Sequence, residues 1–264
     1  LLSSAIKKYA DLFGVACGEK NILFTNNDSV YETAISLIQK GIKVQAIIDN
    51  REEIDSKLIK ETEKNNIKIY KGYTIVDTFG YKRINSVSIM KLSKDGQKVI
   101  GSKENISCDS LGISGGWTPA VHLFTQSGGK LKFRDDDQVF IPNTYPSNQI
   151  SIGSCNGDFT LDEILINTPK LLKEFLNIKK TEYENIEIYS AFNKSKRNIW
   201  LLPSNKIVGK TKSFVDFQND ATAKDIKLAL REGFRSIEHV KRYTTTGMGT
   251  DQGKLGNMHA LGII

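Results

Sequence analysis

A strand–helix–strand pattern between Asn21 and Asp49 constrains the fold of this chain more than any other feature. The short apolar run Ile22–Thr25 has the character of a buried parallel strand. Apolar residues then recur at the spacing of one helix face, and a second apolar run, Val44–Ile48, follows. Two such strands joined by a helix form a βαβ unit, which predicts an α/β fold with a Rossmann-like parallel sheet.

The ends of the predicted helix also have sequence signals. Ser29 is followed three residues later by Glu32, which predicts a capping box at the start. Gly41 stands where the helix is expected to stop.

A βαβ unit of this kind commonly binds a dinucleotide through a glycine-rich turn. The three glycine positions of that turn fall here on Thr25, Asn27 and Val30, so none of them is glycine. An acidic residue after the second strand usually binds the ribose, and Asp49 is placed for that role. The candidate nucleotide-binding residues at this turn are Asn26, Asn27, Asp28 and Asp49. The alternative is a Rossmann scaffold that has lost or altered its ligand.

Further elements follow the βαβ unit. The pattern predicts a charged helix over Glu52–Lys64 and strands over Ile67–Tyr70, Tyr73–Phe79 and Ile84–Leu92. Asp95-Gly96 is a two-residue turn signal.

A strand predicted over Ser107–Ile113 runs into Gly115 and Gly116, just before Pro119. Glycines at the end of a strand let a ligand or another chain approach the backbone closely. Gly115 and Gly116 are therefore candidate cofactor-binding residues. A tight turn without a ligand explains them equally well.

A second junction of this kind lies between Ile150 and Leu176. A strand over Ile150–Ile152 is expected to lead into small residues and then a helix over Leu161–Leu176, capped by Asp158 or Thr160. A helix N-terminus after a strand is suited to receive phosphate. The candidate residues here are Gly153, Ser154, Asn156 and Gly157. Cys155 is interpreted as a packing residue rather than a nucleophile, because no neighbouring His or second Cys supports a redox role. His122 lies in an apolar run and is interpreted as a core residue rather than a catalyst.

The C-terminal part is predicted to be helical. Thr222 with Asp225 predicts a capped helix that ends at Gly233, and Ser236 begins a second helix. Two short helices joined at a glycine admit a DNA-reading helix-turn-helix, but the second helix has few polar positions that could contact bases.

The composition excludes several classes of protein. The chain has 264 residues, with 37 basic and 30 acidic side chains and a net charge of +7. Its lysines are scattered, which favours a compositional bias over a nucleic-acid partner. The three cysteines lie far apart in the sequence, which fits a reducing compartment. No apolar run approaches the roughly 20 residues that a membrane-spanning helix needs.

Three stretches resemble the α subunit of heterotetrameric sarcosine oxidase. They are the Gly-poor turn Phe24–Tyr31, the Gly-Trp segment Ser114–Phe124 with its continuation Gln126–Lys130, and the C-terminal segments Phe214–Asp220 and Glu238–Met248. Together the resemblance covers essentially the whole chain.

The resemblance implies an oxidoreductase acting on CH–NH groups, which demethylates sarcosine to glycine in the cytoplasm. The α subunit binds NAD, and tetrahydrofolate accepts the one-carbon unit through a domain absent here. FAD and FMN act mainly through the partner subunit, and the partners are the β, γ and δ subunits. No nucleic acid, membrane or metal is implied, and no residue stands out as catalytic. The chain would be the central fragment of α and inactive by itself.

The implied fold is a Rossmann-like scaffold of the two-dinucleotide-domain flavoprotein-reductase type. It has a small α-helical C-terminal module that resembles a bacterioferritin-associated ferredoxin-type domain. The expected parts are a connecting segment 1–17, an inner Rossmann-like nucleotide domain 18–101, the returning part of the outer FAD/NAD-binding-type domain 102–176, a connector 177–212 and the helical module 213–264.

Two alternatives remain at this point. A related amino-acid or opine dehydrogenase would share the scaffold but carry a [2Fe–2S] cluster in the helical module. Alignment with such modules places the four ligand positions on Asp216, Gln218, Asp251 and Gly256, so all four thiolates are missing and no iron–sulfur cluster is expected. The other alternative is a noncatalytic basic module that binds nucleic acid.

Overall fold

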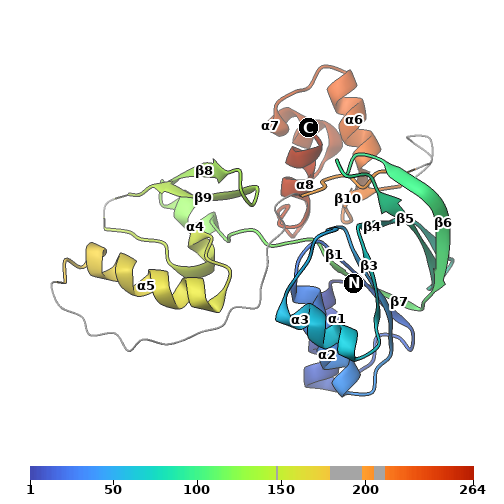
Figure 1. Ribbon diagram of the computed structural model, residues 1–264. Coiled ribbons are helices and arrows are strands. Elements are labelled where there is room, and N and C mark those ends of the chain that lie inside the picture. Colours follow the sequence, from blue (N-terminus) through green and yellow to red (C-terminus); the bar gives the residue numbers. More distant parts are fainter. Residues whose placement is uncertain (147, 179–197, 205–211) are drawn as a thin grey trace. The chain divides into compact units, whose positions relative to one another are not determined.

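The computed structural model describes residues 1–146, 148–178, 198–204 and 212–264 (Figure 1). Most of the predicted connector 177–212 therefore lies outside the described residues. The chain divides into two compact units, Leu1–Ser88 with Asn105–Asn198, and Ile89–Glu104 with Ile199–Ile264. The domain boundaries expected from the sequence stay predictions.

A parallel four-stranded sheet forms the centre of the first unit. Its strand order is β3-β2-β1-β7, with β1 at Asn21–Thr25, β2 at Val44–Asp49, β3 at Lys68–Lys71 and β7 at Ser110–Ser114. The predicted βαβ unit is confirmed, since α2 at Ser29–Gln39 connects β1 and β2. Every residue of β1 is buried, which explains its continuous apolar run.

Helices cover this sheet and complete its core. They are α1 at Ser3–Phe13, α2 and α3 at Lys57–Lys64. Ile6 and Ala10 of α1 join Leu23, Leu37 and Ile47 in one buried cluster. The sequence pattern did not predict α1, which lies within the expected connecting segment 1–17. The predicted helix over Glu52–Lys64 begins only at Lys57, where the Ser56 side chain accepts a hydrogen bond from the Ile59 N–H.

The other strands form smaller sheets. β4 at Tyr73–Gly80, β5 at Ile84–Leu92 and β6 at Val99–Ser107 make a three-stranded sheet, and β8 at Lys130–Arg134 pairs with β9 at Val139–Thr144. The strand predicted over Ser107–Ile113 is divided, because β6 ends at Ser107 and β7 begins at Ser110. The strand predicted over Ile150–Ile152 is wrong, since no strand is assigned there and the 3₁₀ turn η1 follows at Gly153–Asn156.

Two further helices belong to this unit, α4 at His122–Gln126 and α5 at Leu161–Phe175. Thr160 and Glu163 form a capping box at the start of α5, which confirms Thr160 as its cap. His122 is exposed, so its interpretation as a packing residue was wrong; only Phe124 of α4 is buried.

The C-terminal unit contains a helical module. β10 at Phe214–Asp216 pairs with β11 at Ala221–Thr222, followed by α6 at Ala223–Arg231, α7 at Ile237–Thr244 and α8 at Gly256–Ile263. The predicted capping box of Thr222 and Asp225 is confirmed. Ile226, Ala229 and Val240 form the buried centre of this module. The sequence pattern missed α8, whose short apolar run lacks amphipathic spacing.

Candidate functional site

The carboxyl edge of the parallel sheet brings together residues from three strands. Thr25 of β1 lies opposite Asp49 of β2 on one side and opposite Ser114 of β7 on the other. In open α/β sheets, ligands bind outside the carboxyl ends of the strands. The two residue sets predicted separately, Asn26–Asp28 with Asp49 and Gly115 with Gly116, therefore meet at one edge.

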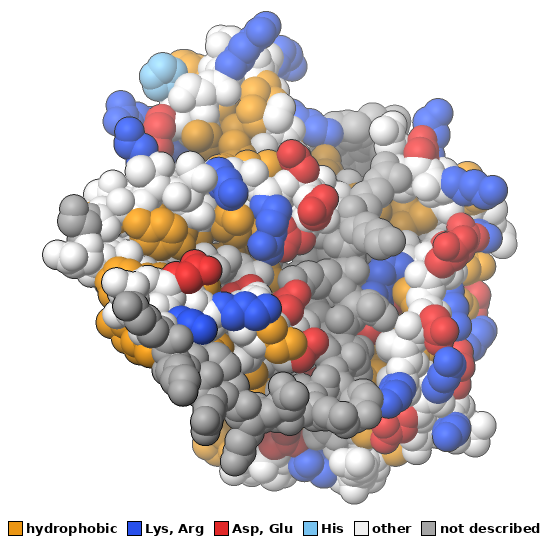
Figure 2. Space-filling view, turned by 60° about the vertical axis from the view of Figure 1, so that its left-hand side comes forward, with side chains coloured by type: hydrophobic (Ala, Val, Ile, Leu, Met, Phe, Trp, Pro, Cys, Tyr) orange, Lys and Arg blue, Asp and Glu red, His pale blue; other side chains and the backbone are white. Residues whose placement is uncertain are grey.

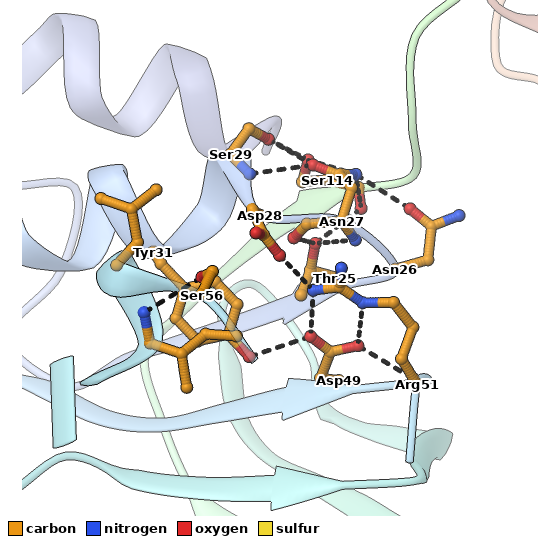
Figure 3. Close-up of polar contacts among 12 residues, drawn as sticks. Thr25, Asn26, Asn27, Asp28, Ser29, Tyr31, Asp49, Arg51, Ser56 and Ser114 are labelled. Carbon is orange, nitrogen blue, oxygen red and sulfur yellow. Dashed lines mark hydrogen bonds and ion pairs between the residues drawn. The ribbon is translucent and has the colours of Figure 1, made fainter. Parts of the chain in front are cut away.

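The turn between β1 and α2 satisfies its own backbone groups with side chains (Figure 3). The Thr25 hydroxyl accepts a hydrogen bond from the Asn27 N–H at 3.0 Å, and Asn27 Oδ1 accepts one from the Ser29 N–H at 3.1 Å. In glycine-rich turns such N–H groups contact the pyrophosphate instead. The predicted capping box of Ser29 and Glu32 is wrong, because Asp28 is the residue that precedes the helix and the Ser29 hydroxyl bonds to Asn27 Oδ1 at 2.6 Å.

Amide side chains connect this turn to β7 and the glycines that follow it. Asn27 Nδ2 donates to Ser114 Oγ at 3.1 Å, and Asn26 Nδ2 donates to the Gly115 carbonyl at 3.1 Å. A Cβ added at Gly115 would meet no atom within 4 Å, whereas Gly116 has φ +114°, which favours glycine. The edge beside Gly115 therefore has room for a ligand group.

The Asp49 carboxylate is held by other residues of the chain. It is fully buried, and its Oδ2 accepts hydrogen bonds from Tyr31 Oη at 2.9 Å and Arg51 Nη2 at 2.7 Å. Its Oδ1 accepts from Arg51 Nε at 3.0 Å and from the backbone N–H of Arg51 at 2.9 Å. Arg51 Nη2 also lies 2.8 Å from Asp28 Oδ1 (Figure 3). Both oxygens of Asp49 thus hold Arg51 and Tyr31, rather than pointing to a ligand.

The buried charges of this cluster shift the pKa values of Arg51 and Tyr31. Burial lowers the pKa of Arg51, but the hydrogen bonds and charges of Asp49 and Asp28 outweigh burial and raise that pKa. Burial and the Asp49 charge raise the pKa of Tyr31, which keeps its phenol protonated as a donor. The N–H groups of Asn27 and Ser29 are already bonded to side chains of the turn.

The remaining predicted residues lie on the turn η1 and directly after it. Gly153 and Gly157 have φ values of +66° and +88°, and so they adopt the left-handed backbone that glycine favours. Tyr145 Oη donates to Asn156 Oδ1 at 3.1 Å, and Arg134 Nη2 donates to the Gly157 carbonyl at 2.9 Å. Ser154 is exposed.

The helix that follows this turn does not offer a free N-terminus. The Glu163 carboxylate accepts hydrogen bonds from the N–H groups of Phe159 and Thr160, at 2.9 and 3.1 Å. Asp158 is buried, and its Oδ1 accepts from Asn167 Nδ2 at 2.9 Å. The region beside Gly153–Gly157 therefore holds two carboxylates and also the guanidinium of Arg134, which donates to the Gly157 carbonyl.

Cys17, Cys108 and Cys155 have free thiols, and Cys155 Sγ bonds to the Ile152 carbonyl at 2.9 Å. In the part of the chain that the structure describes, no group of three or more His, Cys, Asp or Glu side chains could hold a metal ion. Among the same residues, no helix is both long and apolar enough to cross a bilayer.

Sequence reasoning missed Arg51, Tyr31 and Ser114. Ser114 had a signal, since a polar residue that ends a buried strand lies at the carboxyl edge of the sheet. Tyr31 and Arg51 had no such signal. They bond to Asp49 from α2 and from the loop after β2, and contacts of this kind produce no periodic pattern in the sequence.

Comparisons with known proteins cover the whole chain. It is 31% identical over 269 residues to the sarcosine oxidase subunit alpha of Rhizobium meliloti (strain 1021) and 29% identical over 273 residues to that of Corynebacterium sp. (strain P-1). These alignments include 100% of this chain but 25% and 28% of the relatives, so the chain spans about a quarter of their length. Residues 210–264 match the sarcosine oxidase A3 domain. The resemblance predicted from the sequence is confirmed.

A solved structure shows the same fold. The L-proline dehydrogenase from P. horikoshii aligns with 96% of this chain and 46% of its own chain, with a TM-score of 0.55 and 18% identity. This likeness supports the predicted α/β dinucleotide-binding fold. The ferredoxin-type character of the helical module stays a prediction.

Proposed function

We propose that this chain, which is similar along its whole length to the α subunits of sarcosine oxidase, is the central, nucleotide-binding part of such a subunit. The observation that carries the proposal is the carboxyl edge formed by β1 and β7, where Gly115 has open space beside Asn26. The proposed cofactor there is NAD. The proposed reaction of the complete enzyme is oxidative demethylation of sarcosine to glycine, with folate as the one-carbon acceptor.

The residues of this chain would bind and position the nucleotide, and they would not perform the oxidation. The flavins, FAD and FMN, supply hydride acceptance and would lie mainly with the partner subunit. The partners proposed are the β, γ and δ subunits of a cytoplasmic complex.

Two parts of the chain would share the nucleotide. Gly115 and Gly116 offer room for close approach, whereas the residues Gly153–Gly157 would contact a sugar. The β1–α2 turn fits a pyrophosphate poorly, since Thr25 and Asn27 already bind its N–H groups. Asp49 would support this turn rather than contact the ribose.

Substituting Gly115 tests this proposal directly. In the intact subunit, Gly115→Val should reduce bound NAD about tenfold or more, because the valine would fill the open space at the sheet edge. Gly115 does not have a positive φ, so the substitution should leave the fold intact. NAD released from equal amounts of purified protein measures the effect.

Two comparison variants sharpen the result. Ser102→Val, on the exposed strand β6, should retain NAD. Asn27→Ala should have a smaller effect than Gly115→Val, because Asn27 contacts the turn and β7 rather than the open space. Normal NAD content in Gly115→Val would contradict the proposal.

Iron content distinguishes this proposal from the alternative of a related amino-acid or opine dehydrogenase. We expect anaerobically purified protein to contain no iron and no acid-labile sulfide, because the four aligned ligand positions lack thiols. Stoichiometric iron with visible charge-transfer absorption would favour the dehydrogenase alternative.

A nucleic-acid module is not favoured by the charge distribution. On the face shown in Figure 2, the basic side chains of the described residues are interspersed with acidic ones. A nucleic-acid surface typically gathers its lysines and arginines in one stripe or patch.

A further inference from the structure

The Asp216 carboxylate lies buried at the end of β10 and collects hydrogen bonds from three separate positions of the helical module. It is only 6% exposed. Its Oδ1 accepts from the N–H groups of Gln218 and Asn219 at 2.8 and 3.2 Å. Its Oδ2 accepts from the Gly247 N–H at 2.7 Å and from Asn219 Nδ2 at 3.2 Å. Four N–H donors therefore converge on one carboxylate.

The bond from Gly247 is the informative one, because it joins segments 31 residues apart in the sequence. Gly247 is buried with φ +71°, a backbone conformation that points its N–H at Asp216. Asn219 adds a second connection to the same loop, since its Nδ2 also donates to the Thr245 carbonyl at 3.2 Å. The loop after α7 is thus held against the β10–β11 turn by one anionic side chain.

The donors carry no formal charge. In the ranges 1–146, 148–178, 198–204 and 212–264, no lysine or arginine forms an ion pair with Asp216. Burial raises the pKa of Asp216, but the hydrogen bonds from Gly247, Asn219 and Gln218 together outweigh it and lower that pKa. Successive backbone N–H groups that point into one concavity form a nest that binds anions.

We propose that these loops form an anion-binding nest and that Asp216 is its resident anion. Without the carboxylate, the buried N–H of Gly247 would be left without its acceptor, which is costly, and the N–H groups of the exposed residues Gln218 and Asn219 would lose theirs. The ligand class of the emptied nest is a small monocarboxylate, such as formate, because it reproduces the shape and charge of the lost group. The inference is independent of the proposed nucleotide site.

The test is chemical rescue of Asp216→Ala, which removes the carboxylate but keeps Cβ. Its thermal unfolding midpoint should fall by about 4–8 °C, because the variant loses four hydrogen bonds, of which the one from Gly247 is buried. Sodium formate should restore at least half of this loss in a saturable manner, whereas sodium chloride at equal ionic strength should not. If the variant does not fold in buffer, its refolding yield with formate and with chloride replaces the midpoint.

Two other variants make the outcome specific. Asp216→Asn should be destabilised but not rescued, because its amide fills the space that formate would take. Asp220→Asn, in the same turn but exposed, should keep the normal midpoint, and asparagine tolerates its φ of +53°. An Asp216→Ala protein with unchanged stability, or one that responds equally to formate and chloride, would overturn the proposal.

Discussion

Replacing Arg51 with methionine should lower the free energy of unfolding by about 3–5 kcal/mol, the usual cost of breaking a buried ion pair from one side. The Asp28 and Asp49 side chains that Arg51 pairs with are both fully buried, and the Arg51 side chain is 13% exposed. Methionine has a similar length but no charge or donor. The variant would leave the buried carboxylates of Asp28 and Asp49 without the Arg51 guanidinium. Urea denaturation measures the loss in the free energy of unfolding.

Two controls separate burial from ion pairing in general. Lys60→Met removes the partner of Asp55 from a pair whose side chains are 66% and 78% exposed, and it should cause no measurable loss. The double variant Arg51→Met with Asp49→Asn should lose less than the sum of the two single variants, because the second change removes one of the unpaired charges. An Arg51→Met protein as stable as Lys60→Met would show that the cluster contributes little.

The Arg51 cluster lies at the turn where a Rossmann fold usually contacts its dinucleotide. In a dinucleotide site, the acidic residue after β2 faces the ligand and the turn is glycine-rich. Here the same acidic position, Asp49, is bonded to Tyr31 from α2 and to Arg51 from the loop after β2. The turn residues Thr25, Asn27 and Val30 and the Asp49 carboxylate therefore make contacts within the protein at positions where a glycine-rich Rossmann turn contacts its ligand.

The elements that could be predicted from the sequence are those with a strong local pattern. β1, α2 and β2 have continuous or helical apolar spacing, and the caps Thr160 and Thr222 have an acidic residue three positions on. These signals depend on neighbours in the sequence, so they survive without tertiary information.

The elements that could not be predicted depend on contacts between distant segments. Ser29 with Glu32 has the pattern of a capping box, but the Asn27 side chain takes the Ser29 N–H and hydroxyl instead. His122 lies in an apolar run, yet only Phe124 of its short helix turns inward. The ribose-binding role of Asp49 was predicted from its position after β2 alone. Its contacts with Tyr31 and Arg51 depend on side-chain geometry, which the sequence does not show.

Gly256, one of the positions aligned with iron–sulfur ligands, lies against β10. A Cβ built there would lie 2.8 Å from the Val215 carbonyl oxygen and 3.8 Å from the Asp216 Cβ, so the start of α8 packs directly on β10. Gly256→Val should therefore lower the free energy of unfolding by about 1–3 kcal/mol through overpacking, as measured by urea denaturation. Lys254→Val, at an exposed position two residues earlier, should be close to neutral. If Gly256→Val were as stable as the control, α8 would have room to move away from β10, and a ligand side chain at this position would fit. The expected loss would show instead that the backbone at Gly256 has no room for a larger side chain against β10.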